Sequence, residues 1–391
     1  MGCALATTSS SVPLTALSFP KAEYERRQVG VFESMVRAKL DALVVTAHGH
    51  LQYLIGYDGT GGYFMPFALI LVPGQKPTFV VREYELGSVR AGSCVEEIIV
   101  YREQFDFAPV CANTIRRHGL AGRRIGLELG CWNLAPADVN ALQGQLPDTN
   151  FADASRLVAT VAAIKTDLEL DVMRFAMAMT DVAVRTFQNS LEEGVTEVEV
   201  AANIDRDVEK AGGVVQATSS TLLFGERTKL SHGTPKRHPI RNNEPAFLEI
   251  GGVKNGYACG LVRSAQLGRH AETELLHELS VEVLEAVISA IKPGVTAGEV
   301  DAVGRAVLKR HGRAEFLNHR VGYQTGINWV ERGNISLEPG ATDVLEPNMT
   351  LHMPIILCGE SGYLIGTSGH VLVTERGAET LSRTSHTLYR A

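Results

Sequence analysis

The chain of 391 residues lacks the features that would place it in several specialised classes of protein. It has no block of basic residues, and its formal net charge is -7, so no surface is expected to neutralise a run of nucleic-acid phosphates. No apolar run approaches the roughly 18 residues that suggest a membrane-spanning helix. We therefore expect neither a nucleic acid nor a membrane as a partner.

Cysteine is scarce and scattered. The six cysteines show no CxxC spacing, and residues 1–20 have neither a basic start nor a continuous apolar core of the kind found in a secretion signal. Scattered thiols in such a chain are typical of a reducing compartment, so we predict a cytoplasmic protein without disulfides. Residues 1–21 are interpreted as a flexible N-terminal arm.

What the chain does have is a globular composition, with 45% hydrophobic and 21% charged residues. Its length is sufficient for two domains, each with its own core. In the first half, apolar runs alternate with helical patterns, which is typical of an α/β sheet domain. The predicted domain covers 22–160, with helices at 23–40 and 105–119, strands at 42–45, 67–72, 77–81, 96–101 and 124–129, and a segment at 151–165 that links it to the second half.

The second half, 161–391, has a different pattern. A long helix is predicted at 167–190 from apolar residues spaced three or four apart. A helix ending at Gly212 begins with a capping-box pattern at Thr196, and the pattern recurs at Thr296, before a helix at 297–311. With a further helix at 272–291, two helix pairs each precede a strand-rich stretch. This order suggests an internal duplication.

Four sequence blocks in this order resemble the creatinase/aminopeptidase P family. They are AIKTDLELDVMRFAMAMTD at 163–181, FLEIGGVKNGYACGLVRSAQLG at 247–268, HRVGYQTGI at 319–327 and VLEPNMTLHMP at 344–354. The resemblance implies an α/β (α+β) fold, in which a pita-bread catalytic domain follows a smaller creatinase-type N-terminal domain. It also implies a homodimer.

Metal-dependent members of that family bind two metal ions through two Asp, one His and two Glu residues. The resemblance places these positions at Glu249, Gly260, Tyr323, Pro354 (or the adjacent Met353) and Ser368–Gly369. At most one carboxylate remains there, and hard divalent cations need several oxygen or imidazole ligands. We therefore predict no metal and no other cofactor.

Among metal-free members, ectoine hydrolase is the most similar, on the blocks GYDGTGGYF, LEIGGVKNGYACGLVRS, HRVGYQTG and VLEPNMTLHMP. The segment YLIGTSGH departs from the ectoine-type pattern, which has a Glu near the final strand. Val262 stands where creatinase has a glutamate, which makes creatine a poor substrate.

Two residues are predicted to be catalytic. His232, in SHGTP, precedes Glu249 by the offset at which the family places its catalytic histidine, and its imidazole can exchange a proton near neutral pH. His238 is the alternative in the same loop. Glu249 interrupts an apolar strand, where desolvation favours a raised pKa and a role as acid, base or nucleophile. The alternative is an ion pair with Arg263.

A further group is predicted to bind the substrate. Tyr323 and His352 occupy pocket positions of the family, and Arg332 offers a bidentate fork for a carboxylate. Aromatic and acidic residues of the N-terminal loop suit a small cation and are expected to complete the partner subunit's pocket in the homodimer. The substrate-binding candidates are Tyr323, His352, Arg332, Arg263, Tyr63, Phe64 and Asp58.

From these residues we predict a metal-independent hydrolase of a non-peptide carbon–nitrogen bond, an amidine or amide, in a small zwitterion. The alternatives are a lyase or dehydratase on the same scaffold, and a metal-free pseudo-peptidase that acts as a binding module. A metal-dependent peptidase is disfavoured by the ligand count.

Overall fold

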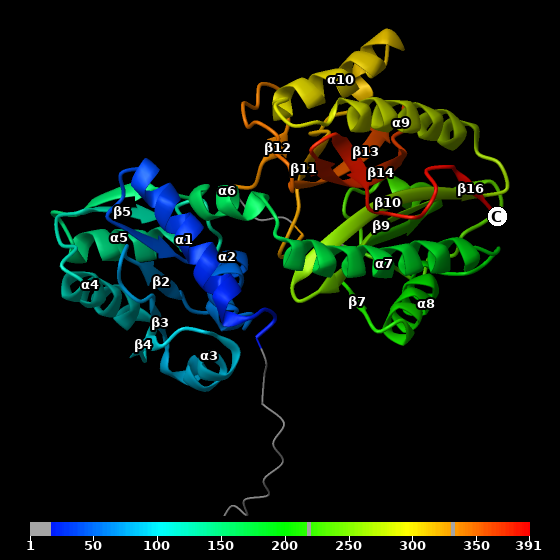
Figure 1. Cartoon of the computed structure of the whole chain (residues 1–391). Helices are drawn as coiled ribbons and strands as arrows, with labels where there is room; N and C mark the ends of the chain where they lie inside the picture. Colours follow the sequence, from blue (N-terminus) through cyan, green and yellow to red (C-terminus); the bar gives the residue numbers. More distant parts are fainter. Residues whose placement is uncertain (1–16, 217–219, 330–332) are drawn as a thin grey trace, which may run out of the picture. The chain divides into compact units, whose positions relative to one another are not determined.

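The computed structural model describes residues 17–216, 220–329 and 333–391. The chain divides into two compact units, Met1–Ser155 and Arg156–Ala391. Figure 1 shows both, the first in blue to cyan and the second in green to red. The boundary expected at 160/161 falls within helix α6 (Leu157–Ala163) of the second unit.

The first unit contains a six-stranded mixed sheet in the order β4-β3-β2-β1-β5-β6. Its strands are β1 (Ala42–Val45), β2 (Ala68–Leu71), β3 (Thr78–Arg82), β4 (Glu97–Tyr101), β5 (Arg124–Leu127) and β6 (Asn150–Asp153). Strands β1 and β2 are buried along their whole length, because they are continuous apolar runs covered on both faces.

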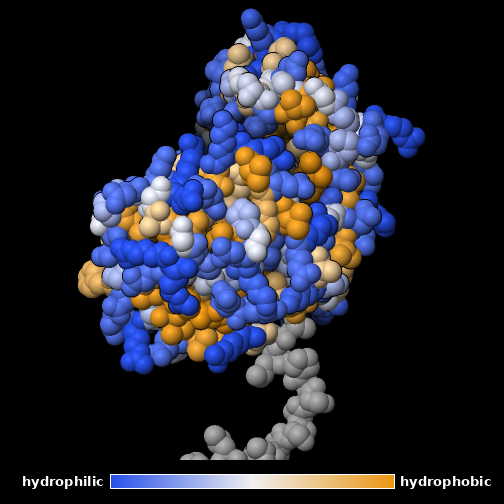
Figure 2. All heavy atoms as spheres, turned by 60° about the vertical axis from the view of Figure 1, so that its left-hand side comes forward, coloured by the Kyte–Doolittle hydropathy of each residue, from blue (hydrophilic) through white to orange (hydrophobic). Residues whose placement is uncertain are grey.

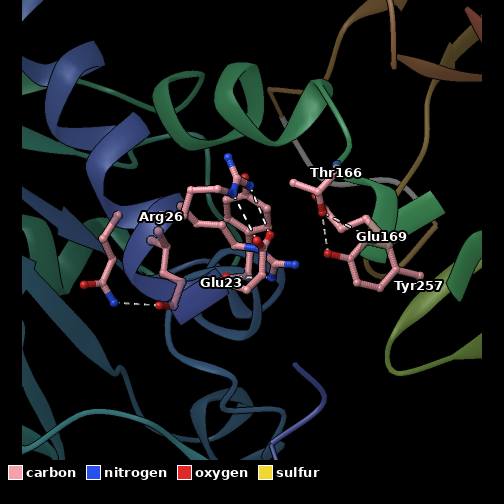
Figure 3. A network of polar contacts seen from close by, with 9 residues as sticks. Glu23, Arg26, Thr166, Glu169 and Tyr257 are labelled. Atoms are coloured by element: carbon pink, nitrogen blue, oxygen red, sulfur yellow. Dashed lines mark hydrogen bonds and ion pairs between the residues drawn. The ribbon is translucent and has the colours of Figure 1, made fainter. Parts of the chain in front are cut away.

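Helices cover this sheet. They are α1 (Lys21–Arg37), α2 (His48–Ile55), α3 (Leu86–Gly92), α4 (Phe107–Arg117) and α5 (Pro136–Gln145). Cys111 and Ile115 of α4 and Leu142 of α5 pack in one core with the sheet. Within α1, Glu23 accepts hydrogen bonds from the guanidinium groups of Arg26 and Arg27 (Figure 3).

The second unit is built on a ten-stranded sheet whose main path is β12-β11-β13-β14-β10-β9-β7. The strands are β7 (Val214–Val215), β8 (Thr221–Phe224), β9 (Glu244–Lys254), β10 (Tyr257–Leu267), β11 (Gly322–Gln324), β12 (Ser336–Leu337), β13 (Thr350–Cys358), β14 (Leu364–Thr374), β15 (Gly377–Thr380) and β16 (Tyr389–Arg390). Two long antiparallel hairpins, β9–β10 and β13–β14, form its centre.

Two helix pairs accompany these hairpins. Helix α7 (Asp167–Asn189), paired with α8 (Glu197–Lys210), packs on β9 and β10, and α9 (Ala271–Ala290), paired with α10 (Ala297–Arg310), packs on β13 and β14. The same arrangement therefore occurs twice, as the order of elements in the sequence suggests. Figure 1 shows α7 along one side of the sheet and α9 along another.

The start of α7 is fixed by polar contacts. Thr166 and Glu169 form a capping box, and Tyr257 of β10 donates a hydrogen bond to Glu169 Oε1 at 2.7 Å. Figure 3 shows Tyr257 pointing at Glu169 beside Thr166. The hairpin β9–β10 is thus tied to the first turn of the helix that packs on it.

Within the described residues, no helix is both long and apolar enough to cross a bilayer. On the face drawn in Figure 2, hydrophobic residues form separate patches between hydrophilic ones.

Candidate functional site

The second unit encloses a cavity of about 570 Å³ at one face of its sheet. Its walls come from strands β8, β9, β11, β13 and β14 and from the loops around residues 230 and 319. The lining residues are Thr221, Thr228, Leu230, Ser231, His232, Phe247, Glu249, Asn318, His319, Arg320, Tyr323, Trp329, Pro354, Ile356 and Leu364. The structure therefore places His232, Glu249 and Tyr323 in the wall of one cavity.

Glu249 is the acidic residue of the cavity wall. It lies in the middle of β9, opposite Thr221 of β8 and Val262 of β10. Within the described residues its carboxyl group has no hydrogen-bond or ion-pair partner. Desolvation by burial raises the pKa of Glu249 to about 7. The carboxyl group is therefore poised to exchange a proton near neutral pH.

His232 lies in the loop that follows the 3-10 helix Gly225–Lys229. Its side chain is exposed, its backbone has φ 53°, and its Nδ1 lies 3.1 Å from Ser231 Oγ. A left-handed backbone is unusual for a residue with a side chain and is often found at functional positions. The alternative candidate, His238, does not line the cavity, and its carbonyl oxygen accepts a hydrogen bond from Glu197 N.

Tyr323 and Trp329 form the wall on the β11 side. The indole Nε1 of Trp329 donates a hydrogen bond to Tyr323 Oη at 3.1 Å. Trp329 is 2% exposed, and its φ of 68° turns the side chain back over the sheet. Burial, with a smaller contribution from the charge of Glu249, raises the pKa of Tyr323, so the phenol stays protonated.

His352 lies behind Tyr323. It faces Tyr323 across the β11–β13 ladder, and its Nδ1 is 3.1 Å from Tyr323 Oη. Its side chain is 0% exposed and is not part of the cavity wall. The predicted direct contact between His352 and a substrate therefore has no support in this placement.

Arg320 is a cavity residue that the sequence reasoning missed. Its guanidinium lies 4.3 Å from the centroid of the Tyr323 ring, and its Nη1 donates to Ser336 Oγ at 3.1 Å. Within the described residues Arg320 forms no ion pair, so it is free to bind an anion. Its position in the family block HRVGYQTGI could have identified Arg320 as a site residue from the sequence. The sequence reasoning instead chose Arg332, which lies outside the described residues.

Arg263 points away from the cavity. On β10 it pairs with Leu248, whereas Val262 pairs with Glu249, so Arg263 and Glu249 lie on opposite faces of the hairpin. The guanidinium is 1% exposed and donates to the carbonyl oxygens of Val262 and Ser368, both at 2.7 Å. Neither substrate binding by Arg263 nor the alternative ion pair with Glu249 agrees with this geometry.

The N-terminal loop candidates belong to the first unit. Tyr63 and Phe64 are 81% and 80% exposed, and Asp58 is exposed as well. Tyr57 of the same loop is instead buried against Phe67 and Phe79. That the exposed residues complete the pocket of a partner subunit in a homodimer stays a prediction.

The residues at the expected metal positions do not fit a pair of divalent cations. Glu249 is one carboxylate, but Gly260 and Pro354 carry no donor side chain, and Tyr323 and Ser368 carry neutral hydroxyls. A Cβ at Gly260 would lie 1.8 Å from Trp329 Cζ2, so the indole fills the space that an aspartate there would need. Within the described part of the chain, no three His, Cys, Asp or Glu side chains gather in a way that could hold a metal.

Comparisons with known proteins agree with this architecture. A model of metallopeptidase family M24 matches residues 171–375, and a model of the creatinase/prolidase N-terminal domain matches 30–164. The chain therefore belongs to metallopeptidase family M24. The predicted creatinase/aminopeptidase P fold, with a pita-bread domain behind a creatinase-type domain, is confirmed, and membership places the chain among hydrolases.

Several relatives cover most of the chain. A protein of Sinorhizobium fredii described as an uncharacterized hydrolase/peptidase is 29% identical over 384 residues, 95% of this chain and 97% of its own length. The putative dipeptidase YkvY of Bacillus subtilis is 26% identical, over 83% of this chain and 90% of its own. Among solved structures, the dipeptidase PepE of Mycobacterium ulcerans has a TM-score of 0.84 at 24% identity, covering 95% of this chain and 99% of its own, which shows the shared fold.

These comparisons correct the predicted chemistry. The prediction of a non-peptide carbon–nitrogen bond is wrong, because the relatives and structural neighbours are peptidases and dipeptidases. They also give no support to a particular similarity to ectoine hydrolase. The non-peptide bond was inferred from the resemblance to metal-free members of the family, but the side chains at the metal positions determine how a carbonyl is activated and not which bond is broken.

Proposed function

We propose that the chain hydrolyses the peptide bond of a short peptide with a free C-terminal carboxylate, using Glu249 as the base that activates water. The observation that carries this proposal is the carboxyl group of Glu249 in the cavity wall, which has no partner among the residues that the structure describes and whose pKa burial raises to about 7. The names of the relatives, which include a putative dipeptidase, support a peptide as the substrate.

In the reaction, Glu249 takes a proton from a water molecule as the water oxygen bonds to the peptide carbonyl carbon. The carbon–nitrogen bond then breaks, and the departing nitrogen receives a proton. His232, exposed at the cavity, is the proposed donor of that proton, a role that imidazole groups commonly fill in catalysis. The products are a carboxylic acid and an amine, and Glu249 returns its proton through His232.

Arg320 is the proposed anchor for the substrate carboxylate. It is a cavity-lining cation without an ion pair in the described residues, and a guanidinium binds a carboxylate through two parallel hydrogen bonds. The cavity thus offers a cationic group for one end of a short peptide and an acid–base pair for its bond. This arrangement favours dipeptides and tripeptides over long chains.

We propose further that the reaction needs no pair of metal ions. The support is the donor set, in which Glu249 is the one carboxylate at the five expected positions and Trp329 occupies the space beside Gly260.

The test is incubation of the purified protein with a panel of dipeptides, including Xaa-Pro, with products detected by mass spectrometry. Glu249→Gln should lower kcat/KM about 100- to 10,000-fold, the usual effect of losing a general base. Glu193→Gln, which removes an exposed charge outside the cavity, is the matched control and should keep full activity. Arg320→Met should raise KM for dipeptides but not for their C-terminal amides. Binding of dipeptides without any turnover would refute the proposal in favour of a binding module.

The pH dependence gives a second test. Glu249 must be ionised to act as a base, so kcat/KM should rise about tenfold per pH unit below pH 7 and level off above it. A kcat/KM that does not rise between pH 5 and pH 7 would rule out Glu249 as the base.

A further inference from the structure

A chain of hydrogen bonds runs from the cavity wall into the sheet behind Tyr323. Tyr323 Oη accepts from Trp329 Nε1 at 3.1 Å and lies 3.1 Å from His352 Nδ1. His352 Nε2 lies 2.9 Å from Ser368 Oγ, which accepts from the backbone N–H of Val262 at 2.6 Å. Four strands contribute to the chain, and of these residues only Tyr323 and Trp329 line the cavity.

Which groups donate and which accept in this series of hydrogen bonds depends on the tautomer of His352. Burial keeps the pKa of His352 well below its usual range, so the ring is neutral, with one N–H and one acceptor nitrogen. In one arrangement Ser368 donates to Nε2 and Nδ1–H donates to Tyr323. In the other, Nε2–H donates to Ser368 and Tyr323 donates to Nδ1.

The two arrangements differ in which hydrogen atom is left without an acceptor. In the second, Ser368 Oγ accepts two N–H groups, and its own hydrogen has no acceptor in the described residues although the side chain is 0% exposed. An unpaired buried hydroxyl hydrogen is unfavourable. In the first arrangement every buried hydrogen has an acceptor, and the hydrogen of Tyr323 is the one left to point into the cavity. The first arrangement is therefore favoured.

We propose that Tyr323 is a catalytic hydrogen-bond donor that stabilises the oxyanion formed when water attacks the peptide carbonyl, and that His352 and Ser368 are positioning residues that fix its hydroxyl as a donor. The proposal rests on the peptide-hydrolase function above. Tyr323 keeps its proton throughout. Because its oxygen accepts two N–H groups, the O–H bond is polarised and donates more strongly. A preorganised donor of this kind acts where negative charge develops in the transition state.

The tautomer can be measured without a substrate. In protein labelled with ¹⁵N-histidine, two-bond ¹H–¹⁵N spectra should show His352 protonated at Nδ1, with the signal assigned by its loss in His352→Gln. His370 is an internal reference, because its Nδ1 faces the carbonyl oxygen of Gly260 at 3.3 Å and its Nε2 lies 2.9 Å from Thr325 Oγ1. A His352 ring protonated at Nε2 in the unmodified protein would overturn the proposal.

Ser368→Ala is the informative variant, since it removes the donor to His352 Nε2 without touching the cavity. It should shift His352 toward the Nε2–H tautomer, and Ser368→Thr, which keeps a hydroxyl, should restore Nδ1–H. Ser264→Ala is the matched control. Ser264 is also buried and accepts a backbone N–H, from Gly366 at 2.9 Å. Within the described residues its side chain forms no hydrogen bond with Tyr323, His352 or Ser368, so the His352 signals should not change. If the His352 tautomer is unchanged in Ser368→Ala, Ser368 does not position His352 and that part of the proposal is wrong.

Kinetics on a hydrolysed dipeptide test the catalytic role. Tyr323→Phe should lower kcat about 100- to 1000-fold, as loss of an oxyanion donor does, with KM nearly unchanged. Ser368→Ala should lower kcat at least about tenfold, and the double variant should be no slower than Tyr323→Phe, because both changes remove the same donor. Tyr257→Phe, at a buried tyrosine outside the cavity, is the control and should keep kcat.

The outcomes separate the two proposals. An active enzyme whose Tyr323→Phe variant keeps full kcat refutes the oxyanion role and leaves the peptide-hydrolase function standing. A protein with the Nδ1–H tautomer that hydrolyses no peptide refutes that function, and with it the catalytic use of Tyr323.

Discussion

Glu249→Gln should stabilise the second unit, and the gain should grow with pH. The carboxyl has a pKa of 4.5 when solvated and about 7 when folded. Between these values the folded state holds more protons than the unfolded state, so stability is fully present below pH 4.5 and falls as pH rises toward 7. At about 1.36 kcal/mol per pKa unit, the full loss is about 3 kcal/mol, and about 2.5 kcal/mol of it falls between pH 5 and pH 8. Glutamine does not titrate, so the variant escapes this loss.

The assay uses the position of the two tryptophans. Trp132, in the first unit, is 75% exposed, so Trp132→Phe leaves Trp329 as the fluorescent reporter of unfolding of the second unit. In that background, urea unfolding followed by fluorescence at pH 5 and pH 8 gives the free energy of unfolding with and without Glu249→Gln. Glu193→Gln, which removes an exposed charge, should change stability equally at both pH values. If the difference between Glu249→Gln and its parent stays constant across this range, the carboxyl is not desolvated and the argument for a base near pH 7 fails.

Two further predictions concern the space around Gly260. Elemental analysis of the active protein should find no stoichiometric transition metal, and chelation should leave the activity unchanged, because one carboxylate cannot hold two cations; two metals per chain with loss of activity on chelation would contradict this. Gly260→Ala should cost about 1–3 kcal/mol of stability through a clash with Trp329, and Trp329→Ala in the same chain should relieve that clash. Gly144→Ala, where nothing lies within 4 Å of the added carbon, is the control.

The sequence predicted most accurately the helices and strands that are determined by interactions between residues close in sequence. The capping boxes at Thr196 and Thr296 begin α8 and α10 as expected, because a side chain and a backbone N–H three residues apart settle that geometry. The apolar run ALVV forms β1 with the predicted bounds. The segment 151–165, predicted as a link, instead contains β6 and α6, which are too short to show a clear period.

The site could be predicted only in part. Motif offsets placed His232, Glu249 and Tyr323 together, because the family motifs already contain the tertiary arrangement. The motifs do not show, however, in which direction each side chain points. Arg263 and Arg320 look equally suitable in the sequence, yet one lies inside the sheet and the other lines the cavity. For Arg263 strand register decides the face, and a shift of one residue would reverse it, whereas Arg320 lies in the loop that precedes β11.

Trp329 shows most clearly what the sequence could not reveal. No role is predicted for Trp329 from the sequence, but its positive φ brings the indole over Gly251 and Gly260 and its N–H onto Tyr323. An aspartate at 260 and this indole cannot occupy the same space, so the glycine at 260 and the position of the indole depend on each other. The same indole also donates to Tyr323 Oη one of the two N–H groups that, in the proposed arrangement, hold the phenol as a donor. Gly260 and the hydrogen-bonded phenol are therefore physically coupled, and any attempt to place a carboxylate at this position by Gly260→Asp must also remove Trp329 and, with it, part of the support of Tyr323.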